Sequence, residues 1–181
     1  MFEYRRCILT YCDILGFQSI ISSNPNVHEI GSILRSLQTF SAPSENREYI
    51  FFTSFSDLVV RGRVLRSDGS EELACALALE AQDILFAQTE IANRRVLIRG
   101  AVTVGMLCVQ SGVIFGPALI DAYRMERDLA RFPRVIVADT VMAQIGYLLS
   151  PDCNLNSSLG HILRLDADGI GLPDLLYQRD G

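Results

Sequence analysis

The order of strand-like and helix-like segments restricts the fold of this chain more than any other feature of its sequence. Strand-like runs at residues 5–14 and 49–63 flank a helical stretch over roughly 17–41. A long amphipathic pattern covers 71–92, and another strand-like run follows at 95–104. Because strands and helices are mixed in this way, we expect an α+β fold with a mainly antiparallel sheet and helices packed against it.

Two segments carry the turn signals of hairpins. Residues 49–63 predict two strands joined at Ser54-Phe55-Ser56, and Gly105 to Phe115 predicts a second hairpin that turns at Ser111-Gly112. Three further elements are expected: a helix over 117–130, a short strand after Pro133 and a helix near 139–149. The resulting order, β-α-β-β-α-β-β-α-β, contains a ferredoxin-like βαββαβ core.

The length of 181 residues is that of one domain, and the hydrophobic content of 49% is enough for a full core. We therefore expect a single domain over 1–181, with its core at about 5–150. A polar loop begins at Ser150-Pro151-Asp152, and residues 161–166 and 174–178 are expected to add edge strands.

All 16 basic residues are arginine, and the chain contains no lysine. The absence of lysine excludes a P-loop and Schiff-base catalysis, so a bound phosphate must be held by arginine, backbone N–H groups or a metal. With 21 acidic residues the net charge is −5, which argues against nucleic acid or an anionic membrane as a partner.

The five cysteines, at positions 7, 12, 75, 108 and 153, form no CxxC pair, and no secretion signal is found. No run approaches the ~20 uncharged apolar residues of a membrane span. The two histidines, His28 and His161, are far apart in the sequence and argue against a His-rich zinc site. We expect a cytoplasmic protein with reduced thiols and no membrane association.

Asp13 and Asp57 are the side chains that most strongly suggest chemistry. Asp13 ends a buried strand just before Gly16-Phe17, and Asp57 follows the turn of the first hairpin. If these strands are neighbours, the two carboxylates converge and repel each other unless a cation lies between them, and their oxygens suit Mg²⁺ or Mn²⁺. Removing either one should then hold or raise the metal-free melting temperature. The alternative is a helix-capping Asp13 and a turn-forming Asp57.

Four segments, in order, resemble the motifs of class III nucleotidyl cyclases. YCDILGF and SFSDLVV resemble the two metal-binding motifs, whose aspartates fall on Asp13 and Asp57. RGAVTVG at 99–105 resembles the strand after the long helix, and GVIFGPALIDAYRME at 112–126 resembles the segment that leads into the catalytic helix. The most similar group is the bacterial pyrimidine cyclases of the Pycsar anti-phage systems. The resemblance covers roughly residues 5–137 and implies one cyclase catalytic domain.

The resemblance implies a homodimer in which one subunit holds two Mn²⁺ or Mg²⁺ ions and the other supplies the catalytic helix. Asp13, Asp57 and the carbonyl of Ile14 would be the metal ligands. Backbone N–H groups that open the first helix suit the phosphates of a nucleoside triphosphate. These groups belong to Leu15, Gly16, Phe17 and Gln18. Arg99, in the middle of a strand, needs a carboxylate or a phosphate partner; we favour a structural ion pair over phosphate binding.

On the catalytic helix, the asparagine and arginine of the family fall on Ile120 and Arg124. The arginine is present and can offset negative charge that develops at the α-phosphate. The asparagine, which contacts the ribose in the family, is absent. An exposed helix face is the alternative role for Arg124.

The two positions that read adenine in adenylyl cyclases fall on Thr53 and Val113, which carry neither the lysine nor the aspartate. This departure argues against ATP and favours a pyrimidine, with UTP preferred over CTP because Pycsar cyclases often make cyclic UMP. The product would be a second messenger of anti-phage defence, read by a separate cyclic-nucleotide-responsive effector. The alternatives are a cytidylate cyclase, a purine cyclase with unusual base contacts, and a catalytically silent nucleotide-binding module, which the missing asparagine favours.

Overall fold

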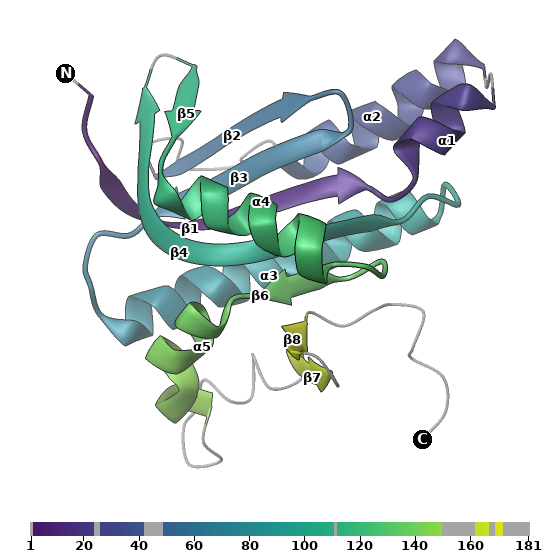
Figure 1. Cartoon of the computed structure of the whole chain (residues 1–181). Helices are drawn as coiled ribbons and strands as arrows, with labels where there is room; N and C mark the ends of the chain where they lie inside the picture. Colours follow the sequence, from purple (N-terminus) through teal and green to yellow (C-terminus); the bar gives the residue numbers. More distant parts are fainter. Residues whose placement is uncertain are drawn as a thin grey trace.

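The computed structural model describes residues 2–23, 26–41, 49–110, 112–149, 162–166 and 169–171 of the chain. Helices and strands follow one another in the expected order (Figure 1). They are β1 (Arg5–Ile14), α1 (Phe17–Ser22), α2 (Val27–Ser41), β2 (Ile50–Phe55), β3 (Leu58–Val64), α3 (Ser70–Ala92), β4 (Ile98–Gln110), β5 (Val113–Phe115), α4 (Pro117–Leu129), β6 (Val135–Val137), α5 (Asp139–Ile145), the short 3-10 helix η1 (Gly146–Leu149), β7 (Arg164–Asp166) and β8 (Gly169–Gly171). The strand expected over 174–178 lies outside the described residues.

The described strands form one sheet in the order β2-β3-β1-β4-β6-β8-β7, and β5 pairs with β4 outside this path. Neighbouring strands are antiparallel except β4 and β6, which are parallel. The four strands β1 to β4 and their helical connections form a βαββαβ unit, so the expected α+β fold is confirmed. β4 is longer than the strand expected over 95–104. It continues beyond Leu107, which pairs with the first residue of β1, and then pairs with β5.

Side chains of β1 alternate between two covered faces of the sheet. Ile8 and Cys12 pack in a core that α3 and α5 cover, whereas Cys7 and Leu9 pack in a second core beneath α4. α4 crosses in front of β1 and β4, and α2 and α3 lie behind the sheet (Figure 1). Asp13 has the same strand parity as Cys7 and Leu9, and it therefore lies on the α4 side.

A cluster of charged side chains fixes β3 to α3 on the opposite side of the sheet. Arg63 Nε lies 2.6 Å from Glu80 Oε1, and Arg63 Nη2 lies 2.8 Å from Asp83 Oδ2. Arg61 pairs with the same two carboxylates, and the Thr10 hydroxyl donates to Glu80 Oε2 at 3.1 Å. Glu80 is fully buried, so these partners offset the hydration that its carboxylate loses. The cluster therefore fixes the position of the β2–β3 hairpin relative to α3.

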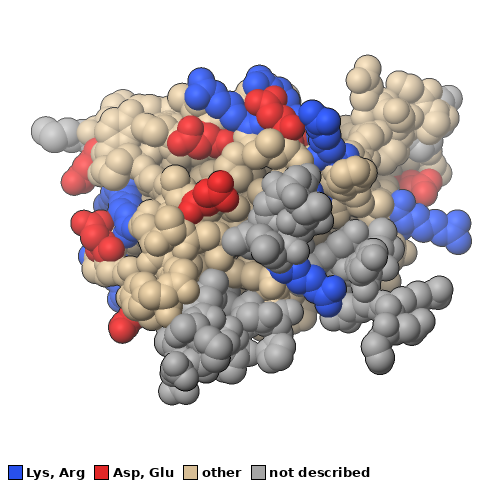
Figure 2. Space-filling view, turned by 60° about the horizontal axis from the view of Figure 1, so that its bottom comes forward, with Lys and Arg blue, Asp and Glu red and all other residues tan. Residues whose placement is uncertain are grey.

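The surface of the described residues carries both signs of charge. On the face drawn in Figure 2, arginines lie beside acidic residues, and the coloured residues do not gather into a broad patch of one sign. Within the described ranges, no helix combines the length and apolar character that a membrane crossing requires.

α4 begins at a glycine that other residues can replace only with strain. Gly116 has a φ of 152°, and a Cβ atom there would lie 2.6 Å from the Met106 carbonyl oxygen and 2.9 Å from Leu107 Cα. Ala118, the second residue of α4, packs so closely on β4 that a Cβ added to Gly105 would lie 3.3 Å from the Cβ of Ala118. The start of α4 is therefore held tightly against β4.

We expect Gly116→Ala to lower the free energy of unfolding by about 1–3 kcal/mol, because the new Cβ meets backbone atoms and the φ is unfavourable. Urea unfolding monitored by circular dichroism measures the loss. Gly146→Ala is the matched control, since Gly146 has a helical φ of −55° and open space around its Cβ position. The control should be unchanged or slightly stabilised. Equal urea midpoints for the two variants would contradict the tight start of α4.

Candidate functional site

The candidate site lies where β1, β3 and β4 come together at one end of the sheet. β1 pairs with β4 residue for residue, which sets Asp13 directly opposite Arg99. On its other side, β1 pairs with β3 as far as Val59, and the same register, continued, sets Ile14 beside Asp57. The carbonyl of Ile14 and the two carboxylates therefore belong to the same end of the sheet.

Asp57 lies in the tight turn between β2 and β3. Phe55 pairs with Leu58, so Ser56 and Asp57 are the two residues that connect the strands. Ser56 has the positive φ of 56° that such a turn requires. The turn thus comes one residue later than the expected Ser54-Phe55-Ser56, and Asp57 belongs to the turn itself.

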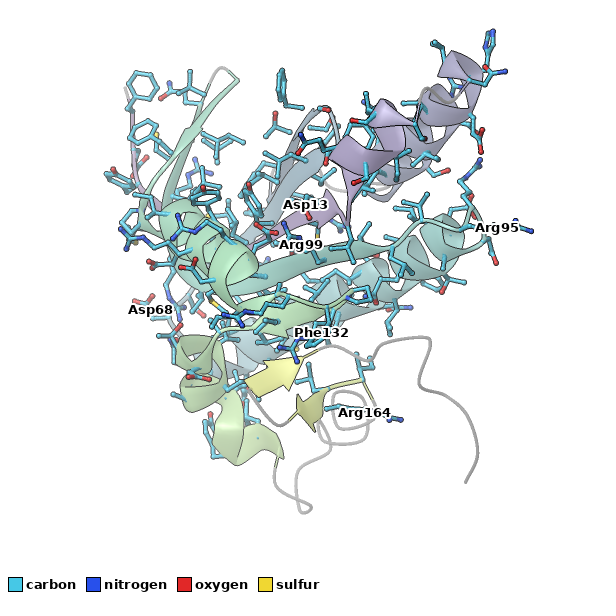
Figure 3. All side chains as sticks on the ribbon, turned by 45° about the vertical axis from the view of Figure 1, so that its right-hand side comes forward. Asp13, Asp68, Arg95, Arg99, Phe132 and Arg164 are labelled. Atoms are coloured by element: carbon cyan, nitrogen blue, oxygen red, sulfur yellow. The ribbon has the colours of Figure 1, made fainter. Side chains whose placement is uncertain are left out.

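The guanidinium of Arg99, which lies near Asp13 in Figure 3, connects the end of β1 to α4. Its Nε donates to Asp13 Oδ1 at 3.1 Å, and its Nη2 donates to Asp13 Oδ2 at 3.4 Å. The same Nε lies 2.7 Å from Glu126 Oε1, within ion-pair distance. The hydrogen bond to Asp13 is the largest cause that raises the pKa of Arg99 above its usual range. Arg99 is therefore a permanent cation between two carboxylates.

The Tyr11 hydroxyl is subject to the charges of three carboxylates. Burial, the largest cause, together with the charges of Glu126, Asp13 and Asp57, raises the pKa of Tyr11 to about 12. Burial, and then the charge of Asp13, raises the pKa of Glu126 as well. Among the described residues, Asp57 has no hydrogen bond or ion pair, and Arg99 is the cation paired with the other two carboxylates. Negative charge is therefore in excess here.

A divalent cation fits both the charge and the donor atoms of this site. Two carboxylates and a main-chain carbonyl are the hard oxygen ligands that Mg²⁺ and Mn²⁺ prefer. In the part of the chain that the structure describes, no three His, Cys, Asp or Glu side chains are grouped to hold a metal. Water or the oxygens of a bound phosphate would have to complete the coordination. Asp13, Asp57 and Ile14 therefore fit a cation whose remaining ligands are water or phosphate oxygens.

The turn from β1 into α1 offers fewer N–H groups than expected. Gly16 adopts a left-handed φ of 74°, which glycine tolerates without strain. The Leu15 N–H donates to the Leu97 carbonyl at 2.8 Å, so it is not free to bind a ligand. The N–H groups of Phe17 and Gln18 belong to the first turn of α1, where the helix supplies no acceptor. The available donors are reduced to Gly16, Phe17 and Gln18.

A cavity of about 480 Å³ opens on the α4 side of the sheet and shares Tyr11 with the charged site. Thr53 and Ile120 both line it, so the structure brings together two positions that the sequence compares with base and ribose contacts. The rings of Tyr11 and Tyr123, also in its wall, meet edge to face at 6.0 Å. Val113 does not line this cavity, and its side chain is exposed on β5.

Arg124 lines a different cavity, of about 340 Å³, between α4, β6 and the start of α5. Within the described ranges, its guanidinium makes no hydrogen bond or ion pair, and so none with Asp13 or Asp57. The structure thus brings Asp13, Arg99 and the end of β1 together in one protomer but leaves Arg124 outside that group.

Sequence patterns assign no catalytic or binding role to Glu126 and predict core or interface positions for Tyr11 and Tyr123. A signal for Glu126 was present, because it continues the buried stripe of Ala118 and Ala122 along α4. A carboxylate on a buried stripe needs a cationic partner, and this requirement points to a strand arginine such as Arg99. The tyrosines give no such signal, since aromatic side chains are common in any core.

By sequence, the chain matches no protein-family model and no curated protein. By structure, it is similar to the adenylyl cyclase CyaB from P. aeruginosa, with a TM-score of 0.61 and 13% identity over 82% of this chain and 84% of that one. It is also similar to the catalytic core of a rhodopsin-guanylyl cyclase with converted specificity, in complex with ATPαS (TM-score 0.57, 14% identity, 80% and 84% covered).

A third similar structure is the guanylate cyclase domain of RhGC from Catenaria anguillulae in complex with GTP (TM-score 0.53, 13% identity, 79% and 84% covered). All three similar structures are adenylyl or guanylyl cyclases, and each is only 13–14% identical to this chain. The chain therefore has the α+β fold of adenylyl and guanylyl cyclase domains.

In the absence of metal, we expect the two aspartates to differ in their contribution to stability. Asp57→Ala should leave the free energy of unfolding unchanged or raise it, because it removes an unpaired negative charge. Asp13→Ala should lower it by about 1–2 kcal/mol, because Arg99 loses a two-point partner that is only partly screened by solvent. The ion pair with Arg99 thus separates Asp13 from Asp57, for which the sequence alone predicts the same effect. Urea unfolding in EDTA measures the free energy of unfolding of both variants. Equal losses would contradict the conclusion that, among the described residues, Asp13 is paired and Asp57 is not.

Proposed function

We propose that this protein is a metal-dependent nucleotidyl cyclase that converts UTP to 3′,5′-cyclic UMP and diphosphate. The observation that carries the proposal is the convergence of Asp13, Asp57 and the Ile14 carbonyl at a sheet end with excess negative charge, on a cyclase fold. We take residues 1–181 as one catalytic domain. Following the resemblance of its motifs to Pycsar cyclases, we propose that the product is an anti-phage second messenger read by a separate effector.

In this proposal, Asp13, Asp57 and the Ile14 carbonyl hold two Mn²⁺ or Mg²⁺ ions. Bound ions of this kind acidify a ribose 3′-hydroxyl and neutralise phosphate charge. The chain's own residues orient the triphosphate: Arg99 offers a planar fork of N–H donors, and Gly16, Phe17 and Gln18 offer backbone N–H groups. Arginine suits this role because it stays charged at every physiological pH.

Attack of the 3′-oxygen on the α-phosphorus expels diphosphate and concentrates negative charge on the phosphoryl oxygens. We assign Arg124 to stabilise this charge. Since Arg124 makes no ion pair with Asp13 or Asp57 of its own chain, we propose that it acts in the site of a second copy. Exposed apolar side chains on β2 and α4 support a homodimer, because a second copy could cover them. Phe55 at the end of β2 is 81% exposed, and Ile120 on α4 is 52% exposed.

The chemistry of the 480 Å³ cavity supports a pyrimidine base. Thr53 and the two tyrosines are the side chains in its lining that bear hydroxyls, and Ile120 and the tyrosine rings supply apolar or aromatic surface. Among the described residues of the lining there is no lysine or aspartate to pair with the edge of adenine, and each unpaired polar group would cost about 1–3 kcal/mol. The short Thr53 hydroxyl reaches a base only in a narrow pocket, which favours one ring over two. UTP is preferred, and CTP is the nearest alternative.

One observation favours a second candidate function, a catalytically silent module that binds a nucleotide. Ile120 stands where the family has an asparagine, and an aliphatic side chain cannot donate a hydrogen bond to ribose. The presence of both Asp13 and Asp57 opposes this alternative, because a silent module has no need for two carboxylates at the same end of the sheet.

Incubation with equal ATP, GTP, CTP and UTP in the presence of Mn²⁺, followed by mass spectrometry of the products, tests the function. We expect cyclic UMP as the main product, because the described lining of the cavity holds neither the lysine nor the aspartate that reads adenine. Asp57→Ala is the control, and its turnover should fall at least about a hundredfold because a metal ligand is lost. Cyclic AMP or cyclic GMP as the main product would overturn the pyrimidine assignment, and cyclic CMP would overturn only the preference for uracil. No product at all would favour the silent module.

Mixing Asp57→Ala with Arg124→Ala tests whether the site is shared between two copies. If each variant alone is inactive, equal amounts should recover about a quarter of normal activity, since half of the dimers would carry one intact site out of two. Subunit exchange should be demonstrated with differently tagged chains. Exchange without any recovery of turnover would count against a composite site.

A further inference from the structure

Glu126 is a buried carboxylate that faces the candidate active site from α4. It continues the stripe of Ala118 and Ala122, which packs on the sheet, and its side chain is only 4% exposed. A carboxylate at such a position loses most of its hydration and is retained only with a cation nearby. The cation is Arg99, whose Nε lies 2.7 Å from Glu126 Oε1.

The contact between Arg99 and Glu126 is close but incomplete. The Nε–H and one Nη2–H of Arg99 are directed at the two oxygens of Asp13, at 3.1 and 3.4 Å. In contrast, Glu126 Oε1 is fully buried and accepts no aligned hydrogen bond from any described residue. Arg99 thus gives its hydrogen bonds to Asp13, while the nearer Glu126 oxygen receives only electrostatic attraction. A small rotation of the guanidinium would exchange these two roles.

Arg99 competes with a divalent cation for Asp13, because it already bonds to both carboxylate oxygens and the two positive charges would repel each other. Metal binding therefore favours a guanidinium that turns away from Asp13, and such a guanidinium needs another buried acceptor if it is to remain at the sheet end. We propose that Glu126 is a positioning residue that receives the Nε–H of Arg99 when Asp13 binds metal, and so keeps the guanidinium fork at the sheet end beside the triphosphate. This inference rests on the metal site of the proposed function.

The alternatives make Glu126 either a purely structural partner of Arg99 or a distant charge that attracts the metal by itself. The three possibilities differ in how the effect of Glu126 depends on Arg99. If Glu126 acts by accepting a hydrogen bond from Arg99, its removal lowers the metal affinity only while Arg99 is present. If it attracts the metal directly, its removal matters with or without Arg99. If it is only structural, the metal affinity of a folded variant is unchanged.

Binding of Mn²⁺ alone, measured by electron paramagnetic resonance without nucleotide, separates these cases. Glu126→Gln keeps the shape of the side chain but removes the acceptor charge, so Arg99 stays on Asp13 and competes with the metal. We expect its Mn²⁺ affinity to fall about tenfold, which corresponds to about 1.4 kcal/mol. Arg99→Ala should bind Mn²⁺ more tightly than the unaltered chain, and adding Glu126→Gln to it should change the affinity by less than about twofold.

Asp128→Asn is the matched control, because it removes one negative charge from the same helix at an exposed position that pairs with Arg127. Its Mn²⁺ affinity should equal that of the unaltered chain. As a second readout, Glu126→Gln should raise the KM for UTP more than it lowers kcat, because Arg99 then orients the triphosphate poorly. If Glu126→Gln does not fold, Glu126→Asp, which withdraws the carboxylate by one methylene, should show the same pattern more weakly.

Three outcomes would overturn the inference: an unchanged Mn²⁺ affinity in folded Glu126→Gln, a tenfold loss that persists in the Arg99→Ala background, or an equal loss in Asp128→Asn. No Mn²⁺ binding by the unaltered chain would overturn both the inference and the metal site. Mn²⁺ binding with the expected pattern but without turnover of any triphosphate would support the inference and overturn the cyclase activity alone.

Discussion

The pairing of β1 with β4 is the constraint on which the other features of the site depend. The two strands run antiparallel through the middle of the sheet, and all ten residues of β1 have a partner on β4. The close contact of the two strands requires a glycine at position 100, because a Cβ there would lie 2.4 Å from the Tyr11 carbonyl oxygen. A slip of one residue would turn Asp13 into the core beneath α3 and leave it without Arg99. The ladder therefore determines which carboxylate meets which cation.

The close approach of α4 to the sheet is the second requirement, and small side chains make it possible. Ala118 and Ala122 are fully buried, and the Thr103 hydroxyl donates to the Ala118 carbonyl at 3.0 Å. With a larger residue in this stripe, the helix would be displaced outward, and Glu126 would no longer lie within reach of Arg99. The geometry of the charged site thus depends on residues that carry no charge.

Much of the fold and part of the site could be predicted from sequence, because both follow from local patterns. The alternation of β1 correctly places Cys7, Leu9, Tyr11 and Asp13 on one face, and short-range turn chemistry predicts the hairpin of β2 and β3, although its turn comes one residue later than expected. The partnership of Asp13 and Arg99 could not be derived in this way, since it joins residues 86 positions apart and depends on the register of two strands. The loss of the Leu15 N–H to the Leu97 carbonyl has the same origin.

The alternation of β1 has a consequence for redesigning this protein. Thr10, which bonds to buried Glu80 behind the sheet, and Asp13, which faces α4, are near neighbours in sequence but have no common side-chain partner. Substitutions on one face therefore leave the packing of the other face nearly unchanged, and their effects should add. A designer could exchange the ionic cluster behind the sheet for an apolar layer to gain robustness, and could separately reshape the cavity in front to accept a different base. Variants of the two faces of the sheet could then be selected separately and combined afterwards.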